Sequence, residues 1–256
     1  MNSHNNALKA LAGFGRSLNR LYENRNHNPL SNGEVTILKK IAEFKPGVII
    51  DGGANIGGYA HLVNTYCPNA AVYCFEPVVK TFNKLTANLK SNNKNTTINK
   101  GLYNQNCSKT INIFPCDEHA SIYDIDSTLQ TSTGSVVIEL MKGDDFLFQQ
   151  DIKSVFLLKL DLEGAEYDAL QGFQNSLKNG IIKFVQFEYG YINITTKRLL
   201  IDYYTLLESY GYILGKVFPK IVEFRKYEFK YEDFIGPNFI AVHKGEIALI
   251  KSLASR

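Results

Sequence analysis

The sequence lacks a strong excess of charge of either sign. Lys and Arg number 28 and Asp and Glu number 25 among 256 residues, so the formal net charge is only +3. A balance this even does not favour nucleic acid as a partner. Long hydrophobic runs are also missing, since the longest apolar runs have the length of a strand and a membrane helix needs ~20 residues. We therefore expect neither a membrane span nor a highly charged nucleic-acid module.

Cysteine is scarce, and its spacing suits neither a metal site nor a redox motif. No C-x-x-C pair occurs, which disfavours a zinc ribbon or a thioredoxin-type motif. The opening residues, M-N-S-H-N-N-A-L-K-A, lack the charged-then-apolar order of a secretory signal peptide. We expect a cytoplasmic protein with reduced thiols and no disulfide framework. The four cysteines are Cys67, Cys74, Cys107 and Cys116.

The first 45 residues differ from the rest in pattern. Residues 7–25 place apolar side chains at helical spacing, with basic side chains mostly elsewhere, which predicts an amphipathic helix. A polar loop follows, and a second helix is predicted over residues 35–44. We take residues 1–45 as an N-terminal helical segment and 46–256 as the main domain. The sequence leaves open whether the first helix packs on the core, contacts a partner or lies on a membrane surface.

Short apolar strands then alternate with amphipathic helices. Strands are predicted at residues 48–50, 71–75, 96–102, 155–160, 181–187 and 239–242, with helices between most of them. This alternation indicates βαβ units and a parallel sheet with helices on both faces. An insertion at about residues 103–150 contains two alternating segments, 110–114 and 135–140, which predict a hairpin.

Acidic residues follow four of the predicted strands. Asp51, Glu76, Asp161 and Glu188 each come at or directly after a strand's carboxyl end. Ligands bind at that edge of a parallel sheet, so we expect a site lined by carboxylates. The alternative is that acids cap the following helices, which accounts for one or two of the four.

The loop after the first strand is rich in glycine but fits neither common phosphate motif. Residues 48–59 read V-I-I-D-G-G-A-N-I-G-G-Y. A P-loop requires Lys and a hydroxyl residue after its last glycine, and these are absent here. G-x-G-x-x-G is absent too, and Asp51 directly before the glycines would repel a pyrophosphate. An acid there suits a cationic ligand.

Glu76 further restricts the class of ligand that the site can bind. It follows the second strand, where a carboxylate can accept hydrogen bonds from both hydroxyls of a ribose. A nucleoside with a positive group on its sugar side chain is S-adenosylmethionine. The pairing of Asp51 with Glu76 therefore predicts this cofactor.

Five segments then make the sequence similar to a known family. They are I-D-G-G-A-N-I-G-G-Y (50–59), C-F-E-P (74–77), G-D-D-F-L (143–147), L-K-L-D-L-E-G-A-E (158–166) and F-I-A-V-H-K (239–244). In this order they resemble the FkbM family of S-adenosylmethionine-dependent methyltransferases. The resemblance implies a Rossmann-like class I methyltransferase: a seven-stranded, mostly parallel sheet with an antiparallel last strand.

The resemblance also implies roles for individual residues. The loop residues would surround the methionine part of the cofactor, Glu76 with Pro77 would hold the ribose, and the backbone near Leu102 would meet the adenine. The family transfers methyl groups to hydroxyls, often on sugars or natural products, so the expected acceptor is a glycan or another small hydroxylated metabolite. The loop residues are Asp51, Gly52, Gly53, Asn55 and Gly57.

The chemistry needs a group that draws a proton from the acceptor hydroxyl. Asp161 and Glu163 are placed where the methyl should emerge, and Asp161 is our candidate base. Lys159 lies on the same side of the strand as Asp161, and an internal salt bridge is as good an explanation for it as catalysis. Paired carboxylates also suit a divalent cation, which we do not favour. His119, Ser121 and Glu188 are candidate acceptor contacts.

Two rival functions use the same cofactor. One is methylation of nucleic acid, against which stand the even charge and the lack of an N/D-P-P-Y-type loop after the fourth strand. The other is a non-catalytic module that binds S-adenosylmethionine. The aromatic and basic stretch 216–234 predicts a hairpin or cap near the cleft, although its interspersed acids favour a solvated surface.

Overall fold

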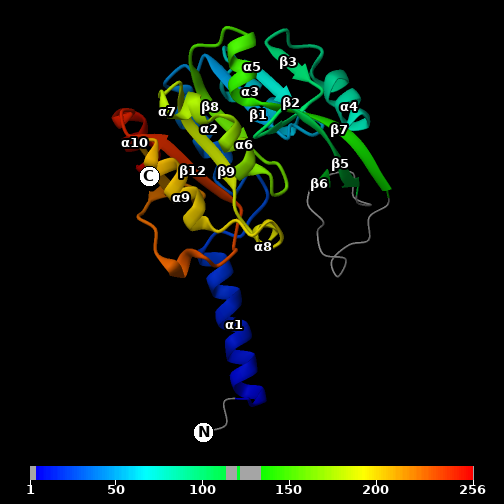
Figure 1. Ribbon diagram of the computed structural model, residues 1–256. Helices are drawn as coiled ribbons and strands as arrows, with labels where there is room; N and C mark the ends of the chain where they lie inside the picture. The colour runs from blue at the N-terminus through cyan, green and yellow to red at the C-terminus, as the bar shows by residue number, and fades with distance from the viewer. Residues whose placement is uncertain (1–3, 114–119, 122–133, 256) are drawn as a thin grey trace.

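A central sheet of eight strands organises the chain (Figure 1). The computed structural model describes residues 4–113, 120–121 and 134–255. Across the sheet the strands are β11 (Val222–Phe224), β10 (Tyr212–Val217), β12 (Asn238–His243), β9 (Ile182–Glu188), β8 (Val155–Leu160), β1 (Val48–Gly52), β2 (Ala71–Phe75) and β3 (Asn95–Ile98).

The five strands from β9 to β3 run parallel, and β12 runs antiparallel to both β9 and β10. The predicted class and the antiparallel last strand are therefore confirmed. The predicted number of seven strands is wrong by one. After β10 the chain turns back, Phe218 N–H donates to Ile221 O, and β11 adds a short edge strand paired with β10.

Helices cover both faces because successive strand residues point to opposite sides. Ile49 and Ile50 of β1 are both fully buried, yet they belong to two different cores. One face packs against α2 (Glu34–Ala42), α3 (Gly58–Tyr66), α4 (Val79–Leu89) and α10 (Ile247–Ala254). The other packs against α5 (Gly143–Gln149), α6 (Glu166–Gly172), α7 (Gln174–Lys178) and α9 (Leu200–Ser209).

A second sheet lies beside the carboxyl edge of the first. Its order is β4 (Gly101–Tyr103), β7 (Gly134–Lys142), β5 (Cys107–Ile113) and β6 (Ala120–Ser121). Strands β5 and β7, which hold most of the two alternating segments of the insertion, pair antiparallel, and β6 lies between them along the chain. The single strand expected at residues 96–102 is instead two strands, because β3 pairs with β2 and β4 pairs with β7.

The first helix stands apart from this body. Helix α1 (Asn6–Tyr22) projects as a separate rod in Figure 1, and none of its side chains is buried. Helix α2, by contrast, packs Leu38 and Ile41 into the core of the sheet. In the described part of the chain, no helix combines the length and the apolar character needed to cross a bilayer.

Candidate active site

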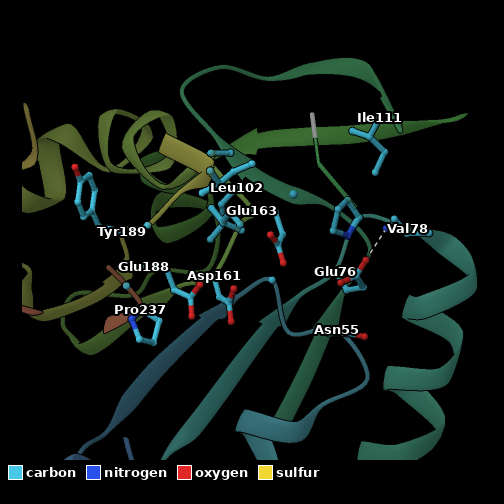
Figure 2. Close-up of a pocket in the computed structure, with 18 of the residues that line it drawn as sticks. Asn55, Glu76, Val78, Leu102, Ile111, Asp161, Glu163, Glu188, Tyr189 and Pro237 are labelled. Atoms are coloured by element: carbon cyan, nitrogen blue, oxygen red, sulfur yellow. Dashed lines mark hydrogen bonds between the residues drawn. The ribbon is translucent and has the colours of Figure 1, made fainter. Parts of the chain in front are cut away.

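A cleft of about 390 Å³ opens at the carboxyl edge of the parallel strands. This volume lies within the range of small-molecule sites, and the position is the one expected for ligands of open α/β sheets. Loops after β1, β2, β8 and β9 supply its floor, and hydrophobic residues of the second sheet close one side. Figure 2 shows the carboxylates of Glu76, Asp161, Glu163 and Glu188 gathered around it.

The glycine loop packs directly on the end of β8. Gly53 has a φ of +80°, and a Cβ built on it would lie 1.8 Å from the carbonyl oxygen of Asp161. The backbone N–H groups of Gly53 and Ala54 both donate to Phe75 O, and Asp161 N–H donates to Gly52 O. Only glycine fits this crossing of β1, β2 and β8. Gly53 and Asn55 both line the cleft.

Three residues of the predicted cofactor loop are not among those that line the cleft: Asp51, Gly52 and Gly57. Asp51 is fully buried, and neither carboxylate oxygen accepts a hydrogen bond from the described residues. Its nearest cation is Lys159, whose Nζ is 3.9 Å from Oδ1. Burial raises the pKa of Asp51 to about 6, although Lys159 opposes the shift. This carboxylate therefore contributes negative potential from beneath the loop.

Glu76 lies in the cleft at the end of β2. Its side chain is 7% exposed, and Oε1 accepts a hydrogen bond of 2.9 Å from Val78 N–H (Figure 2). Burial raises the pKa of Glu76 to about 7, which the backbone N–H groups of Val78 and Asn55 partly counteract. Pro77 and Leu102 also line the cleft.

Lys159 and Asp161 form the salt bridge that the sequence left as an alternative to catalysis. Lys159 Nζ lies 3.0 Å from Asp161 Oδ2, and its side chain is buried. Burial alone would lower the pKa of Lys159, but the carboxylates of Asp161, Asp51 and Glu34 raise it instead. Lys159 lines a smaller adjoining cavity together with Asp161 and Glu188, not the main cleft.

The loop after β8 holds an uncommon backbone conformation. Glu163 has a φ of +50° and Gly164 a φ of +105°, so two successive residues are left-handed. Glu166 supports this turn, because its Oε1 accepts hydrogen bonds from Leu162 N–H and Gly164 N–H. Such strain in a non-glycine residue is typical of functional sites. The turn presents Glu163 to the cleft.

The three candidate acceptor contacts are placed differently. Glu188 ends β9 and lines both cavities, and burial together with the nearby Asp161 raises its pKa well above the ordinary value. Ser121 lies in β6, where its backbone pairs with Asn112. His119 lies outside the described residues. Within the described ranges, no group of three or more His, Cys, Asp or Glu side chains is arranged to hold a metal ion.

The sequence did not point to the N-terminal contribution to the cleft. Arg25 and His27 line it, although they are distant in sequence from the other lining residues. The segment is fixed by Glu23, whose carboxylate is 3.0 Å from the Nζ of buried Lys216, and by Asn24, whose Nδ2 donates to Val217 O at 3.0 Å. Periodicity placed Arg25 at the end of the predicted helix 7–25, although α1 ends at Tyr22, and it placed His27 in the polar loop. The long-range contacts of this segment leave no local signal. Tyr189, Tyr191 and Pro237 were also missed, whereas Phe234 belongs to the stretch 216–234 that was expected near the cleft.

The sheet order, the antiparallel β12 and the acidic cleft at the carboxyl edge are those of a class I S-adenosylmethionine-dependent methyltransferase. Residues 51–214 match the family model described as the methyltransferase FkbM domain. Because this match covers more than half of the chain, the protein belongs to the FkbM methyltransferase family.

Two curated relatives and one solved structure are similar to the chain. Methyltransferase 1 of Beauveria bassiana is 28% identical over 176 residues, covering 58% of this chain and 71% of that protein. Hexuronic acid methyltransferase AglP of Haloferax volcanii is 29% identical over 161 residues, covering 62% of this chain and 64% of that protein. A methyltransferase FkbM structure from Methylobacillus flagellatus KT has a TM-score of 0.50 and 15% identity, covering 77% of this chain and 44% of that one, and it supports the fold alone.

Proposed function

We propose that the protein is an S-adenosylmethionine-dependent O-methyltransferase whose acceptor is a hydroxyl of a sugar, a glycan or another small hydroxylated metabolite. One observation carries the proposal. The carboxylate of Glu76 and those of Asp161 and Glu163 line the same cleft, with the glycine loop between them. The carboxylate of Glu76 suits the hydroxyls of a ribose, and the carboxylates of Asp161 and Glu163 suit an acceptor hydroxyl.

The residues present fit the cofactor. Glu76 would accept hydrogen bonds from the ribose hydroxyls, and Pro77, Val78 and Leu102 would form the apolar wall for the adenine. Gly53 and Asn55 would contact the methionine part through a loop in which a side chain at Gly53 has no room. S-adenosylmethionine supplies a methyl group on a positively charged sulfur, which the surrounding carboxylates favour.

Asp161 is the proposed base. Lys159 holds one of its oxygens at 3.0 Å, which fixes the orientation of the carboxyl group. Since the side chain of Asp161 remains partly exposed to the cleft, it can accept the proton of an acceptor hydroxyl as the oxygen attacks. Glu163 and Glu188 would bind neighbouring hydroxyls of the acceptor. This arrangement needs no metal ion.

The acceptor class is supported by one relative and by one feature of the cleft. AglP is named as acting on a hexuronic acid, a sugar that carries a carboxylate. In this chain Arg25 and His27 are the basic side chains among the described residues of the lining. We therefore favour a sugar acid as the acceptor, with Arg25 facing its carboxylate.

Calorimetry with S-adenosylmethionine and a labelled-methyl screen of acceptors test this function. We expect micromolar binding by the unmodified protein and transfer to sugars that contain glucuronic acid in preference to neutral hexoses. Absence of cofactor binding would refute the enzymatic function. Binding without turnover on any acceptor would favour a non-catalytic module, and transfer to an oligonucleotide but not to sugars would favour the nucleic-acid alternative.

A further inference from the structure

Helix α1 is a rod with one apolar and one basic side. Apolar residues recur at spacings of three and four, and their side chains are open to solvent: Leu11 and Phe14 are each 64% exposed and Leu21 is 79% exposed. Lys9, Arg16 and Arg20 lie on the opposite side of the helix. The part of the chain that the structure describes offers the apolar side no cover.

The charged residues of this helix are all basic, although the chain as a whole has nearly equal numbers of basic and acidic residues. The first acidic residue of the sequence is Glu23, which follows the helix, although the chain has 25 acidic residues in all. A helix with an apolar face, a polar face whose charged residues are all basic, and little net hydrophobicity is typical of segments that lie in a membrane interface. Lys and Arg then add attraction to anionic headgroups.

The base of the helix is rigidly joined to the body. Glu23 pairs with buried Lys216, and the amide of Asn24 donates to Asn32 O and Val217 O. Arg25, the next residue, lines the cleft. Figure 1 shows α1 leaving the body close to α8 (Ile192–Thr196), which follows β9 on the cleft side. A surface that held α1 would therefore lie near the mouth of the cleft.

We propose that α1 binds an anionic lipid bilayer, with its apolar side in the acyl boundary and its basic residues among the headgroups. A second copy of the chain fits the helix less well. The apolar spacing spans about two heptads, short of the three or four that define a coiled coil. Charged pairs that could join two helices are also missing along one border of the apolar row, which is formed by Leu8, Gly15 and Tyr22.

Sedimentation of the full chain with vesicles tests the proposal. Vesicles of equal parts phosphatidylglycerol and phosphatidylcholine should bind at least tenfold more tightly than phosphatidylcholine alone, and 0.5 M salt should abolish the difference. Leu11→Glu should weaken binding about fiftyfold, because the added charge costs about fivefold and the lost apolar contact about tenfold.

Gly13→Glu is the matched control. It adds the same charge on the basic side, where a Cβ meets only Arg16 at 4.0 Å, and it should weaken binding by no more than about fivefold. Both variants should unfold like the parent, since α1 buries no side chain. Equal losses in the two variants, or no binding of the parent to anionic vesicles, would overturn the proposal. A dimer that Leu11→Glu converts to a monomer would assign the apolar side to a second copy instead. None of these outcomes depends on the proposed reaction.

Discussion

Glu76 should make the protein less stable in exchange for binding its cofactor. Burial raises the pKa of this carboxyl from its ordinary 4.5 to about 7. At pH 8 the ionised group therefore lowers the free energy of unfolding by about 3 kcal/mol, because each pH unit corresponds to about 1.4 kcal/mol. The sign of this effect on the free energy of unfolding follows from the direction of the pKa shift. The folded state prefers the protonated acid, so this cost is complete above pH 7 and disappears as the pH falls towards 4.5.

Glu76→Gln removes the charge and keeps the shape. We expect it to raise the free energy of unfolding at pH 8 by about 2 kcal/mol, after about 1 kcal/mol is lost from a weaker hydrogen bond to Val78 N–H. Near pH 5 the variant should have no advantage. Urea denaturation of the free protein at both pH values measures this. A variant less stable than the parent at pH 8 would refute the reasoning.

The same substitution should weaken cofactor binding. Hydrogen bonds to a charged group are worth about 1.5–3 kcal/mol, so calorimetry should show a loss of about tenfold to hundredfold at pH 8. In the parent, affinity should itself fall about tenfold between pH 8 and pH 6, because the carboxyl of Glu76 becomes protonated through a pKa of about 7. A stabilised variant that binds the cofactor as well as the parent would separate Glu76 from the ribose.

Four further predictions concern the cleft. Gly53→Ala should lower the free energy of unfolding by about 2–4 kcal/mol in urea denaturation because its Cβ would meet Asp161 O, whereas Gly58→Ala, with nothing within 4 Å, should not destabilise. Asp161→Asn should lower kcat by about 10²–10⁴-fold with cofactor affinity nearly unchanged, and a matching loss of affinity would argue against its role as base. Arg25→Gln should raise KM about tenfold for an acidic sugar but not for a neutral one, with Arg20→Gln, on α1, as the unaffected control. Full activity in the presence of a chelator is expected throughout.

The parallel strands β1, β2, β8 and β9 were predictable because each is a mostly apolar run with a glycine or an acid at its end, whereas β3 (N-T-T-I) has neither feature. Residues 155–160 are buried at every position, so a run that is apolar except for Lys159 identified β8 without any need for alternation. The alternation of residues 110–114 and 135–140 indicated two strands in the insertion, and β5 and β7 lie there. Edge strand β11 could not be predicted, because its three residues lie in a mixed aromatic and charged stretch and are too few to show an alternation of apolar and polar residues.

The site was predicted in part for a similar reason. Carboxylates at strand ends meet at one edge by topology, which brought Glu76, Asp161 and Glu188 together. Sequence could not show that Asp51 lies beneath the loop, since the turn at Gly53 decides which side chains reach the cleft. Nor could it place Arg25, whose position depends on contacts between residues about 190 apart in the chain.

The most direct test of the central claim is a crystal structure of the protein with S-adenosylhomocysteine. We predict the ribose hydroxyls on the carboxylate of Glu76, the adenine against Leu102 and Pro77, and the sulfur facing the end of β8 where Asp161 lies. A ligand bound elsewhere, or one in this cleft that makes no contact with Glu76, would contradict the account.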